Sequence, residues 1–547
     1  MKIFRNKYAV LAMGAVLSLT SCIDETFPES STVTEDQMSN AGLSSAIAGL
    51  SSQYVQGYLV YGEQEHETDM AYPQFMIAQT EMMGDMYALG SNTGYDWYRT
   101  YNTMDRDMSG TSYFSWLPWR TLYMFVKGAN DAIKTFKSMP EPTDENKNYA
   151  AMAYAYRAYD YYMLTILFEP VANKYTDCSK VLGLTVPIIT EETTEEEAAN
   201  NPRATHDKMM EFILSDLDAA EKIFTETDYK GKDRTAPSLA VVYGLKAKTY
   251  MWDQKYDKAL EYAEKAIKTA EANGAAMMTK QELTSPTSAF ATATSGWLWY
   301  SHYSAENMGN LCNYTGWISG EADWGYSSLT CPGIDKSLCD KMGINDYRRK
   351  WFLDPARKRG DYETCRDEDW LASMPDYLSI KFRCAQGDYK TYSIGGAVDV
   401  PIMRLEELYL IQAEATGLTK GYEEGARLLK LWVNSYRDAA YKCRATNIRE
   451  LQLAVLDQMR IEFWGEGNAF PSAKRIKPGV MQYYKGTNAP AVNYNINAEG
   501  IKPNWNLCIP DFETQVNSIL IEQNNPDPTL SVDGSKCKEG VYAEGKY

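Results

Sequence analysis

The sequence predicts a mainly α-helical protein in which an array of helix pairs carries a long, irregular, loop-rich insertion. Three observations lead to this prediction. Apolar residues recur at helical spacing through much of residues 41–283 and again through 400–475. Between them, residues 284–399 show no sustained helical period and are rich in Gly, Pro, Ser and aromatic residues. Finally, residues 236–274 have the pattern of two helices joined by a tight turn, a unit that buries its apolar face only against neighbours.

The central helix pair shows clear start and stop signals. Pro237 suits a first helical position, and Asn273-Gly274 is a typical helix end. The apolar positions of the second helix follow one face: Tyr256, Ala259, Leu260, Ala263, Ala266 and Ile267. The pair resembles a tetratricopeptide repeat. A second copy spans 422–433, after a helix-like segment that begins at Pro401.

Three weaker amphipathic segments complete the expected scaffold, at residues 119–136, 150–168 and 210–224. Residues 41–60 are also expected to be helical. An array of ordinary core helices without repeat geometry remains the alternative. Residues 61–110 are expected to form an irregular, ring-rich loop, and the Pro- and Asn-rich tail, 476–547, is expected to pack back over the helices.

The N-terminus has the order of a bacterial export signal. Lys2, Arg5 and Lys7 precede an apolar stretch at 8–19, which is too short for a confident membrane span, and Leu19-Thr20-Ser21-Cys22 follows. This stretch resembles a lipobox, which implies cleavage after residue 21 and diacylglycerol on the Cys22 thiol. The polar run 22–40 then forms a flexible tether whose acidic start resembles the surface-export signal of Bacteroidetes lipoproteins. The alternative is an ordinary signal peptide with a chance cysteine.

Composition and motif content narrow the functional classes. The chain has 547 residues and a formal net charge of −18, which argues against a nucleic-acid partner because phosphate binding depends on clustered Lys and Arg. Only three histidines occur, and no catalytic motif accompanies them. Apart from Cys22, nine cysteines are scattered without CxxC spacing, so buried thiols with one or two disulfides are expected. We therefore predict a protein that is not an enzyme and has no cofactor or metal site.

The mature chain resembles the SusD/RagB family of outer-membrane nutrient-binding lipoproteins over most of its length. The order of seven stretches carries the resemblance: the lipobox at Cys22, WRTLYMFVKGANDAI from Trp119, AYAYRAYDYYML from Ala153, RATHDKMMEFILSDLDAAE from Arg203, the helix pair after Pro237, DVPIMRLEELYLIQAEA from Asp399 and MRIEFWGEGNAF from Met459. One departure is NAFPSAKR after Gly467, where the family usually has an arginine and an Asp-Leu pair before Lys or Arg. It puts the local packing there in doubt.

The resemblance implies one unit over 41–547, a tetratricopeptide-like scaffold whose loop-rich insertion forms the ligand face. It also implies a lipid-anchored, surface-exposed outer-membrane protein that captures oligosaccharides and hands them to a TonB-dependent transporter, a SusC-like β-barrel. Three alternatives remain: a peptide-binding member of the family, a surface glycoside hydrolase with paired carboxylates, and a purely protein-binding repeat scaffold.

The ligand site is expected where a ring-rich loop meets the insertion. Flat rings pack against the C–H face of a sugar, while polar neighbours bind its hydroxyl groups. The candidate residues are Trp97, Tyr98, Tyr101, Asp96, Arg99 and Asn102 in the loop, and Trp317, Trp324 and Tyr326 in the insertion. Their Gly-broken, polar surroundings favour exposure of Trp97, Trp317 and Trp324. The alternative is that these rings pin the loops to the core, as expected for Trp297 and Trp299, whose i,i+2 spacing suits a half-buried strand.

Overall fold

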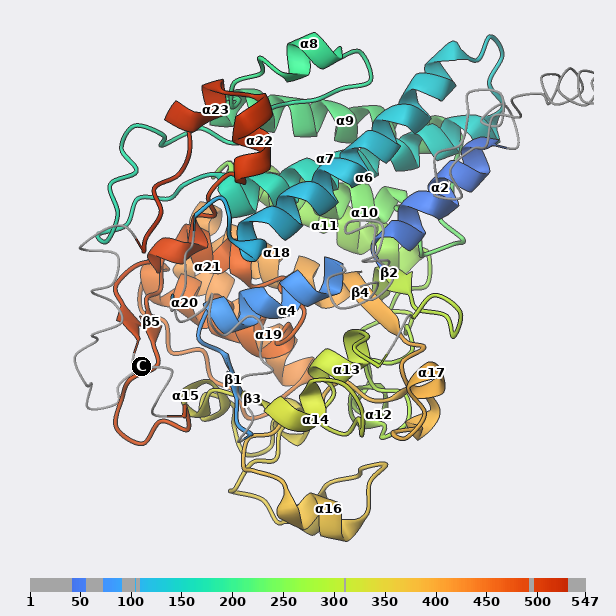
Figure 1. Cartoon of the computed structure of the whole chain (residues 1–547). Coiled ribbons are helices and arrows are strands. Elements are labelled where there is room, and N and C mark those ends of the chain that lie inside the picture. The colour runs from blue at the N-terminus through green and yellow to red at the C-terminus, as the bar shows by residue number, and fades with distance from the viewer. Residues whose placement is uncertain are drawn as a thin grey trace, which may run out of the picture.

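A computed structural model describes residues 42–55, 72–90, 104, 109–308, 311–490 and 496–529. It is mainly helical, as predicted, and its longer helices lie beside a region of short elements (Figure 1). The longer helices are α2 (Gly42–Gln53), α4 (Tyr72–Met82), α6 (Tyr113–Ser138), α7 (Asp144–Phe168), α9 (His206–Glu226), α10 (Leu239–Trp252), α11 (Tyr256–Ala272), α18 (Leu405–Lys420), α19 (Tyr422–Tyr436), α20 (Ile448–Glu462) and α21 (Phe470–Ile476).

The helices form an array in which each member packs on the next. The contacts run from α6 to α7, α9, α10, α11, α18 and α19 in turn, and α2 lies against α6 and α7. The central pair, α10 and α11, is confirmed. Glycine is needed at position 244, where α10 packs against Met403, since a Cβ at this position would lie 2.6 Å from the Met403 sulfur. Gly274 adopts a φ of +90° just after α11 and ends that helix as predicted.

The prediction of a helix that begins at Pro401 is wrong for the first turn. Residues Asp399–Arg404 form strand β4, and α18 starts only at Leu405. Strand β4 pairs antiparallel with β2 (Trp297–His302), which confirms the strand expected for Trp297 and Trp299. After Asp399 every residue of β4 is buried, and all of these residues except Arg404 are apolar. Such a run has no alternation of polar and apolar residues, so its sequence cannot be distinguished from that of a buried helix.

A second correction lies within residues 61–110, where the sequence predicted only irregular chain. Helix α4 and the short strand β1 (Met86–Ala88) occupy part of that range. All residues of α4 are buried, so the helix has no solvent-exposed face and therefore no amphipathic period to reveal it. Strand β1 pairs with β3 (Pro332–Ile334) and so joins this segment to the insertion.

The insertion is irregular, as predicted, and is built from short elements. They are α13 (Tyr314–Ile318), α14 (Ser327–Thr330), α15 (Lys336–Cys339), α16 (Glu368–Ser373) and α17 (Tyr392–Gly395), with 3-10 turns η3 (Tyr347–Trp351), η4 (Arg359–Asp361) and η5 (Ala385–Gly387). Helix α12 (Lys280–Thr284) comes just before the insertion. Elsewhere lie α8 (Glu195–Ala198), β5 (Val480–Met481), β6 (Asn497–Ala498), η6 (Pro503–Trp505), α22 (Asp511–Val516) and α23 (Ile519–Glu522), with β5 paired to β6.

The C-terminal segment packs back over the scaffold as expected, at the C-terminal end of α7. There the Leu507 amide donates to the Leu167 carbonyl at 3.1 Å, and Asn525 Nδ2 donates to the Phe168 carbonyl at 2.7 Å. Lys474 Nζ donates to the carbonyls of Ile166 and Glu169 at 2.8 and 2.9 Å. These bonds satisfy carbonyl groups that a helix end leaves without partners. The unusual stretch after Gly467 therefore supplies a helix cap.

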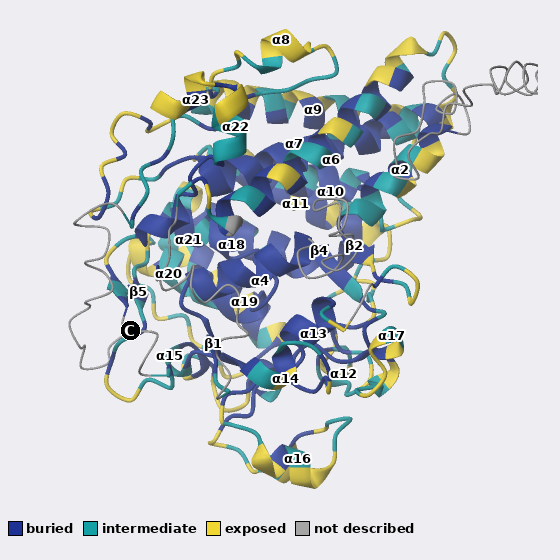
Figure 2. Cartoon of the chain, viewed as in Figure 1, coloured by how far each residue is buried: buried dark blue, intermediate teal, exposed yellow. Residues whose placement is uncertain are grey.

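A main apolar core runs through the described chain, from Leu43 in α2 to Leu520 in α23 (Figure 2), and three smaller clusters lie outside it. Trp297 and Trp299 are fully buried in it, rather than half-buried. Among the described helices, none has both the length and the apolar character that a membrane span requires. The eight described cysteines outside the signal region are all free thiols, so the expected disulfides do not form among them. Cys22 lies outside the described residues.

Candidate functional site

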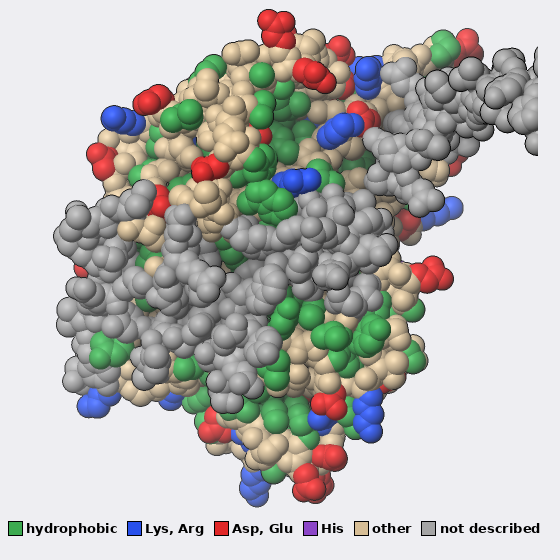
Figure 3. All heavy atoms as spheres, viewed as in Figure 1, with side chains coloured by type: hydrophobic (Ala, Val, Ile, Leu, Met, Phe, Trp, Pro, Cys, Tyr) green, Lys and Arg blue, Asp and Glu red, His purple; other side chains and the backbone are tan. Residues whose placement is uncertain are grey.

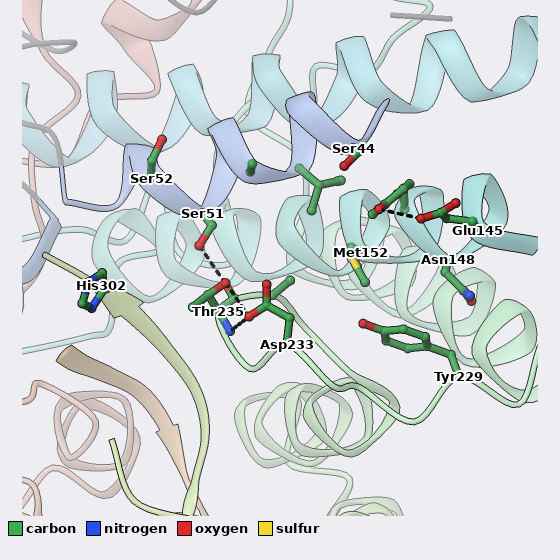
Figure 4. A pocket seen from close by; sticks show the side chains of 14 residues that line it. Ser44, Ser51, Ser52, Glu145, Asn148, Met152, Tyr229, Asp233, Thr235 and His302 are labelled. Atoms are coloured by element: carbon green, nitrogen blue, oxygen red, sulfur yellow. Dashed lines mark hydrogen bonds between the residues drawn. The ribbon is translucent and has the colours of Figure 1, made fainter. Parts of the chain in front are cut away.

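A cavity of about 510 Å³ opens between the N-terminal helix α2 and the central scaffold (Figure 4). Helix α2 forms one wall, the first turns of α7 a second, the 229–236 loop a third, and the end of β2 closes one side. Its lining residues are Ser44, Ile47, Ala48, Ser51, Ser52, Glu145, Asn148, Tyr149, Met152, Tyr229, Asp233, Thr235, Ala236 and His302. The volume falls within the range of small-molecule sites, roughly 300 to 1,000 Å³.

The 229–236 loop is held in place by hydrogen bonds to two helices. The Thr235 carbonyl accepts from Ser51 Oγ of α2 at 2.8 Å and from Tyr156 Oη of α7 at 3.0 Å. Asp233 Oδ1 accepts from the amide and the hydroxyl of Thr235 at 2.9 and 2.7 Å, which folds the chain into a local turn. The bonds among Ser51, Asp233 and Thr235 are drawn in Figure 4. This wall of the cavity is therefore built before any ligand arrives.

Two tyrosine rings flank the cavity. Tyr229 stacks on Phe224, with ring centroids 5.1 Å apart and planes at 20°. Burial, helped by the nearby Asp233 and Tyr149, raises the pKa of Tyr229, so its phenol stays neutral. Tyr149 Oη donates to Glu145 Oε1 at 3.1 Å. A capping box at Thr143 fixes the start of α7, from which Glu145 and Tyr149 project.

The lining suits a polar, uncharged ligand with a hydrocarbon face. Ile47 and Met152 are buried and form an apolar floor, whereas serine, threonine and asparagine side chains surround them. A sugar ring has the matching pair of surfaces, since its C–H groups pack on rings and its hydroxyl groups bind polar side chains. The two lining carboxylates, Glu145 and Asp233, are both exposed. The cavity thus lacks, among its described lining residues, the buried carboxyl that a glycosidase acid requires.

The exposure expected for Trp317 and Trp324 is wrong. Their exposed fractions are 6% and 7%, although glycines surround both in the sequence. The glycines explain the burial of Trp324: a Cβ at Gly395 would lie 2.6 Å from its Cη2 atom, and one at Gly316 would lie 3.2 Å from its Cδ1 atom. The absent side chains leave room for an indole to pack against backbone. Gly-rich surroundings here mean close packing, not an open surface.

Trp317 is buried in the main core and holds Tyr326, which is half-buried. The two rings lie with centroids 4.6 Å apart at 55°. The other predicted ligand residues, Trp97, Tyr98, Tyr101, Asp96, Arg99 and Asn102, lie outside the described part of the chain. Whether any of these positions contacts a ligand stays a prediction.

Sequence analysis missed the cavity residues because they come from segments up to 258 positions apart (44 to 302). No motif links Ser51, Tyr149 and Tyr229, and each alone has an ordinary helix or loop setting.

Two of the histidines each pair with a carboxylate: His302 Nδ1 lies 2.6 Å from Asp399 Oδ1, and His206 Nδ1 lies 2.8 Å from Glu169 Oε1. On the face shown in Figure 3, the Lys and Arg side chains of the described residues lie singly and form no basic patch.

Two family models match the chain. One, described as "Starch-binding associating with outer membrane", matches residues 36–251, and the other, described as the SusD family, matches residues 360–524. Among curated proteins, SusD-like protein P2 of Formosa agariphila is 24% identical over 433 residues, which are 75% of this chain and 79% of that protein. SusD-like protein P38 of the same organism is 25% identical over 269 residues, 47% of this chain and only 45% of that protein.

Solved structures share the fold. A SusD-like carbohydrate-binding protein of Bacteroides vulgatus superposes with a TM-score of 0.67 at 17% identity, covering 89% of this chain and 98% of that one. Surface glycan-binding protein A of Bacteroides thetaiotaomicron, solved in complex with laminarihexaose, superposes with a TM-score of 0.61 at 16% identity, covering 89% and 99%. At these identities the similarity establishes the fold alone.

Proposed function

This chain belongs to the SusD/RagB family, and from that premise we propose that it is a cell-surface lipoprotein that captures oligosaccharides and delivers them to a TonB-dependent outer-membrane transporter. The observation that carries the proposal is the pair of family-model matches in the right order along one chain. The matched family model is described as associating with the outer membrane, and a structural neighbour was solved in complex with laminarihexaose. Glycan binding, rather than a reaction, is the function that the site geometry favours.

The proposed sugar contacts lie on two surfaces. The first is the predicted ring platform, with Trp97, Tyr98 and Tyr101 in the loop and Tyr326 on the insertion. The buried insertion tryptophans Trp317 and Trp324 would not contact the sugar but would hold the segment that carries Tyr326 in place. The second surface is the 510 Å³ cavity, in which Tyr229 and Tyr149 offer rings and the polar side chains offer hydrogen bonds. Asp96, Arg99 and Asn102 would supply the hydroxyl contacts of the platform.

A glycan and peptide array probed with the lipid-free domain identifies the ligand class, and titration calorimetry then separates the two surfaces. Loss of an anchor ring costs about 2 kcal/mol, or roughly thirtyfold in affinity. We expect this loss for Trp97→Ala if the platform binds, and for Tyr229→Ala if the cavity binds. Tyr436→Ala is the control, because this ring is 37% exposed on α19 and belongs neither to the cavity lining nor to the predicted platform residues. Wild-type affinity in both test variants would rule out both surfaces, and peptide-only binding would rule out the glycan.

Delivery is tested with the partner. The native lipoprotein, extracted in mild detergent, should copurify with a large β-barrel protein, and a monodisperse single species would contradict the pairing.

Hydrolysis is the competing function, since Glu145 and Asp233 line one cavity. New reducing ends after incubation of the bound oligosaccharide would show that the protein is an enzyme. We expect the oligosaccharide to be recovered intact.

A further inference from the structure

A second cavity, of about 190 Å³, lies at the N-terminus of α10. We propose that it binds an oxyanion, a sulfate or phosphate group. The lining residues are Lys230, Gly231, Arg234, Ser238, Ala240, Ala270, Asn273, Gly274, Ala275, Ser295 and Leu298. The set contains two cations, several hydrogen-bond donors and no acidic side chain. The proposal does not depend on glycan capture, because a free inorganic anion can test it.

The start of α10 presents donors that have no acceptor. The amides of Leu239, Ala240 and Val241 donate to no acceptor within the described residues, and the first intrahelical bond runs from Val242 to the Ser238 carbonyl. A helix N-terminus with free amides attracts anions through both the amides and the helix dipole. Such a terminus is common, however, and by itself does not make a site.

Ser238 supplies the independent observation. It occupies the N-cap position of α10, yet its side chain makes no capping hydrogen bond. Only 9% of the residue is exposed, and its hydroxyl has no partner in the described chain. A serine at this position ordinarily accepts from the amide two or three residues on. A hydroxyl without a partner, on a residue that is nine-tenths buried and lines a cavity beside free amides, is a donor in place for a ligand.

Arg234 supplies the positive charge. Its Nη1 donates to the carbonyls of Trp297, at 2.9 Å, and Thr294, which fixes the guanidinium without neutralising it. No carboxylate lies within ion-pair distance of Arg234 in the part of the chain that the structure describes, and its remaining N–H groups are available. A planar guanidinium is the side chain best suited to bind the oxygens of sulfate or phosphate. Lys230, on the exposed rim, is paired with Asp228 and contributes less.

The opposite wall repels an anion less than an uncapped helix end would. It is the C-terminal end of α11, where carbonyl groups would normally point outward. The carbonyls of Thr269, Ala270 and Glu271 already accept from the amides of Asn273, Ala275 and Gly274. The net charge of −18 acts from further away, and in physiological salt charges are screened beyond about 8 Å. The local donors therefore decide the sign of the potential in this cavity.

The experiment titrates sodium sulfate, and separately sodium phosphate, into the full chain at ionic strength matched with sodium chloride. Saturable binding by calorimetry is expected for wild type. Arg234→Gln should weaken binding at least tenfold, and Lys230→Gln about threefold or less. Lys232→Gln is the matched control, since this exposed lysine belongs to the same loop but not to the cavity, and it should bind like wild type. Galactose 6-sulfate, compared with galactose, distinguishes a sulfate ester from the free ion.

Ser238→Asp separates binding from folding. An aspartate at the N-cap supports the helix, so the melting temperature should hold or rise, while its charge should abolish anion binding. The circular dichroism spectrum should match wild type. If wild type shows no saturable response beyond sodium chloride, the proposal is wrong. It is also wrong if Arg234→Gln and Ser238→Asp both bind sulfate with unchanged affinity.

Discussion

At the scale of single residues, His206 shows how an apparently incidental histidine can join three helices. It is the first residue of α9, and its ring contacts Glu169 at the end of α7 and Asp253 at the end of α10. The hydrogen bond with Glu169, which outweighs the opposing effect of burial, raises the pKa of His206. The protonated ring is thus more stable in the folded protein than in the unfolded chain.

This pKa shift predicts a pH-dependent stability. Because the folded pKa lies above the unfolded value of about 6.5, the stabilisation is complete below that value and is lost as pH rises through the folded pKa. His206→Gln should therefore lower the unfolding free energy at pH 5.5 and change it little at pH 9. Urea unfolding at the two pH values measures the difference. An equal loss at both would show that the charge has no role.

Glycine at position 395 is a second residue-scale case. A Cβ there would lie 1.9 Å from the Asp388 carbonyl oxygen and 2.6 Å from Trp324, so Gly395→Ala forces backbone to move. We expect a loss of about 1–3 kcal/mol in unfolding free energy. Gly360→Ala is the control, since nothing lies within 4 Å of a Cβ at that glycine of the same insertion. Equal stabilities of the two variants would contradict the packing described for Trp324.

At the scale of elements, a buried ion network joins β4 and helices α18, α19 and α20. Arg437, at the end of α19, bonds Glu462 of α20 at 2.8 Å and Glu406 of α18 at 3.0 Å. Arg404, at the end of β4, bonds Glu462 at 3.0 Å and Glu466 at 2.8 Å. The MRIEFWGEGNAF stretch that carries the family resemblance therefore has a structural role, because its carboxylates Glu462 and Glu466 neutralise arginines from neighbouring elements.

Removing one charge from this network should be costly, because the partners stay buried without compensation. Arg437→Met is expected to cost about 3–5 kcal/mol. The control Arg427→Met, also on α19, breaks an exposed pair with Glu424 and should cost under about 1 kcal/mol. Chemical denaturation measures both. Comparable values would mean that the buried network is energetically no different from a surface pair.

The same network predicts acid sensitivity. Burial alone would raise the pKa of Glu462, but the guanidinium groups of Arg437, Arg404 and Arg348 hold it well below its usual value. A depressed carboxylate pKa contributes stability that is present above the unfolded value, about 4.3, and is lost as pH falls below it. Wild type should thus lose stability below that pH more steeply than Glu462→Gln does.

At the scale of the whole molecule, the lipid anchor predicted at Cys22 can be tested by where the protein is found. Each buried methylene contributes about 0.8 kcal/mol, so two or three acyl chains hold a soluble domain at a membrane where one does not. Cys22→Ala should therefore release the protein into the soluble fraction after detergent-free fractionation. Wild-type folding, seen by circular dichroism, is the control. A variant that still sediments with membranes would require a different tether.

The sequence by itself determined the helical class, the central helix pair, the irregular insertion and the family, because these depend on local periodicity and on motif order along the chain. Helix starts and stops such as Gly274 are also local, since they depend on one residue and its neighbours. The burial of Trp324 could not be predicted in this way, because Gly395, which leaves space for its ring, belongs to a separate segment of the chain.

Only the tertiary structure decided which residues meet. Helix α4 is buried on all sides and β4 lacks alternation, so neither carried the periodicity by which an amphipathic element is recognised. The two cavities join residues from distant segments, and no spacing rule relates Ser51 to Tyr229 or Arg234 to Asn273. The local sequence pattern predicts the conformation of a single segment. A site depends instead on how several segments pack together, and the core that they share determines this packing.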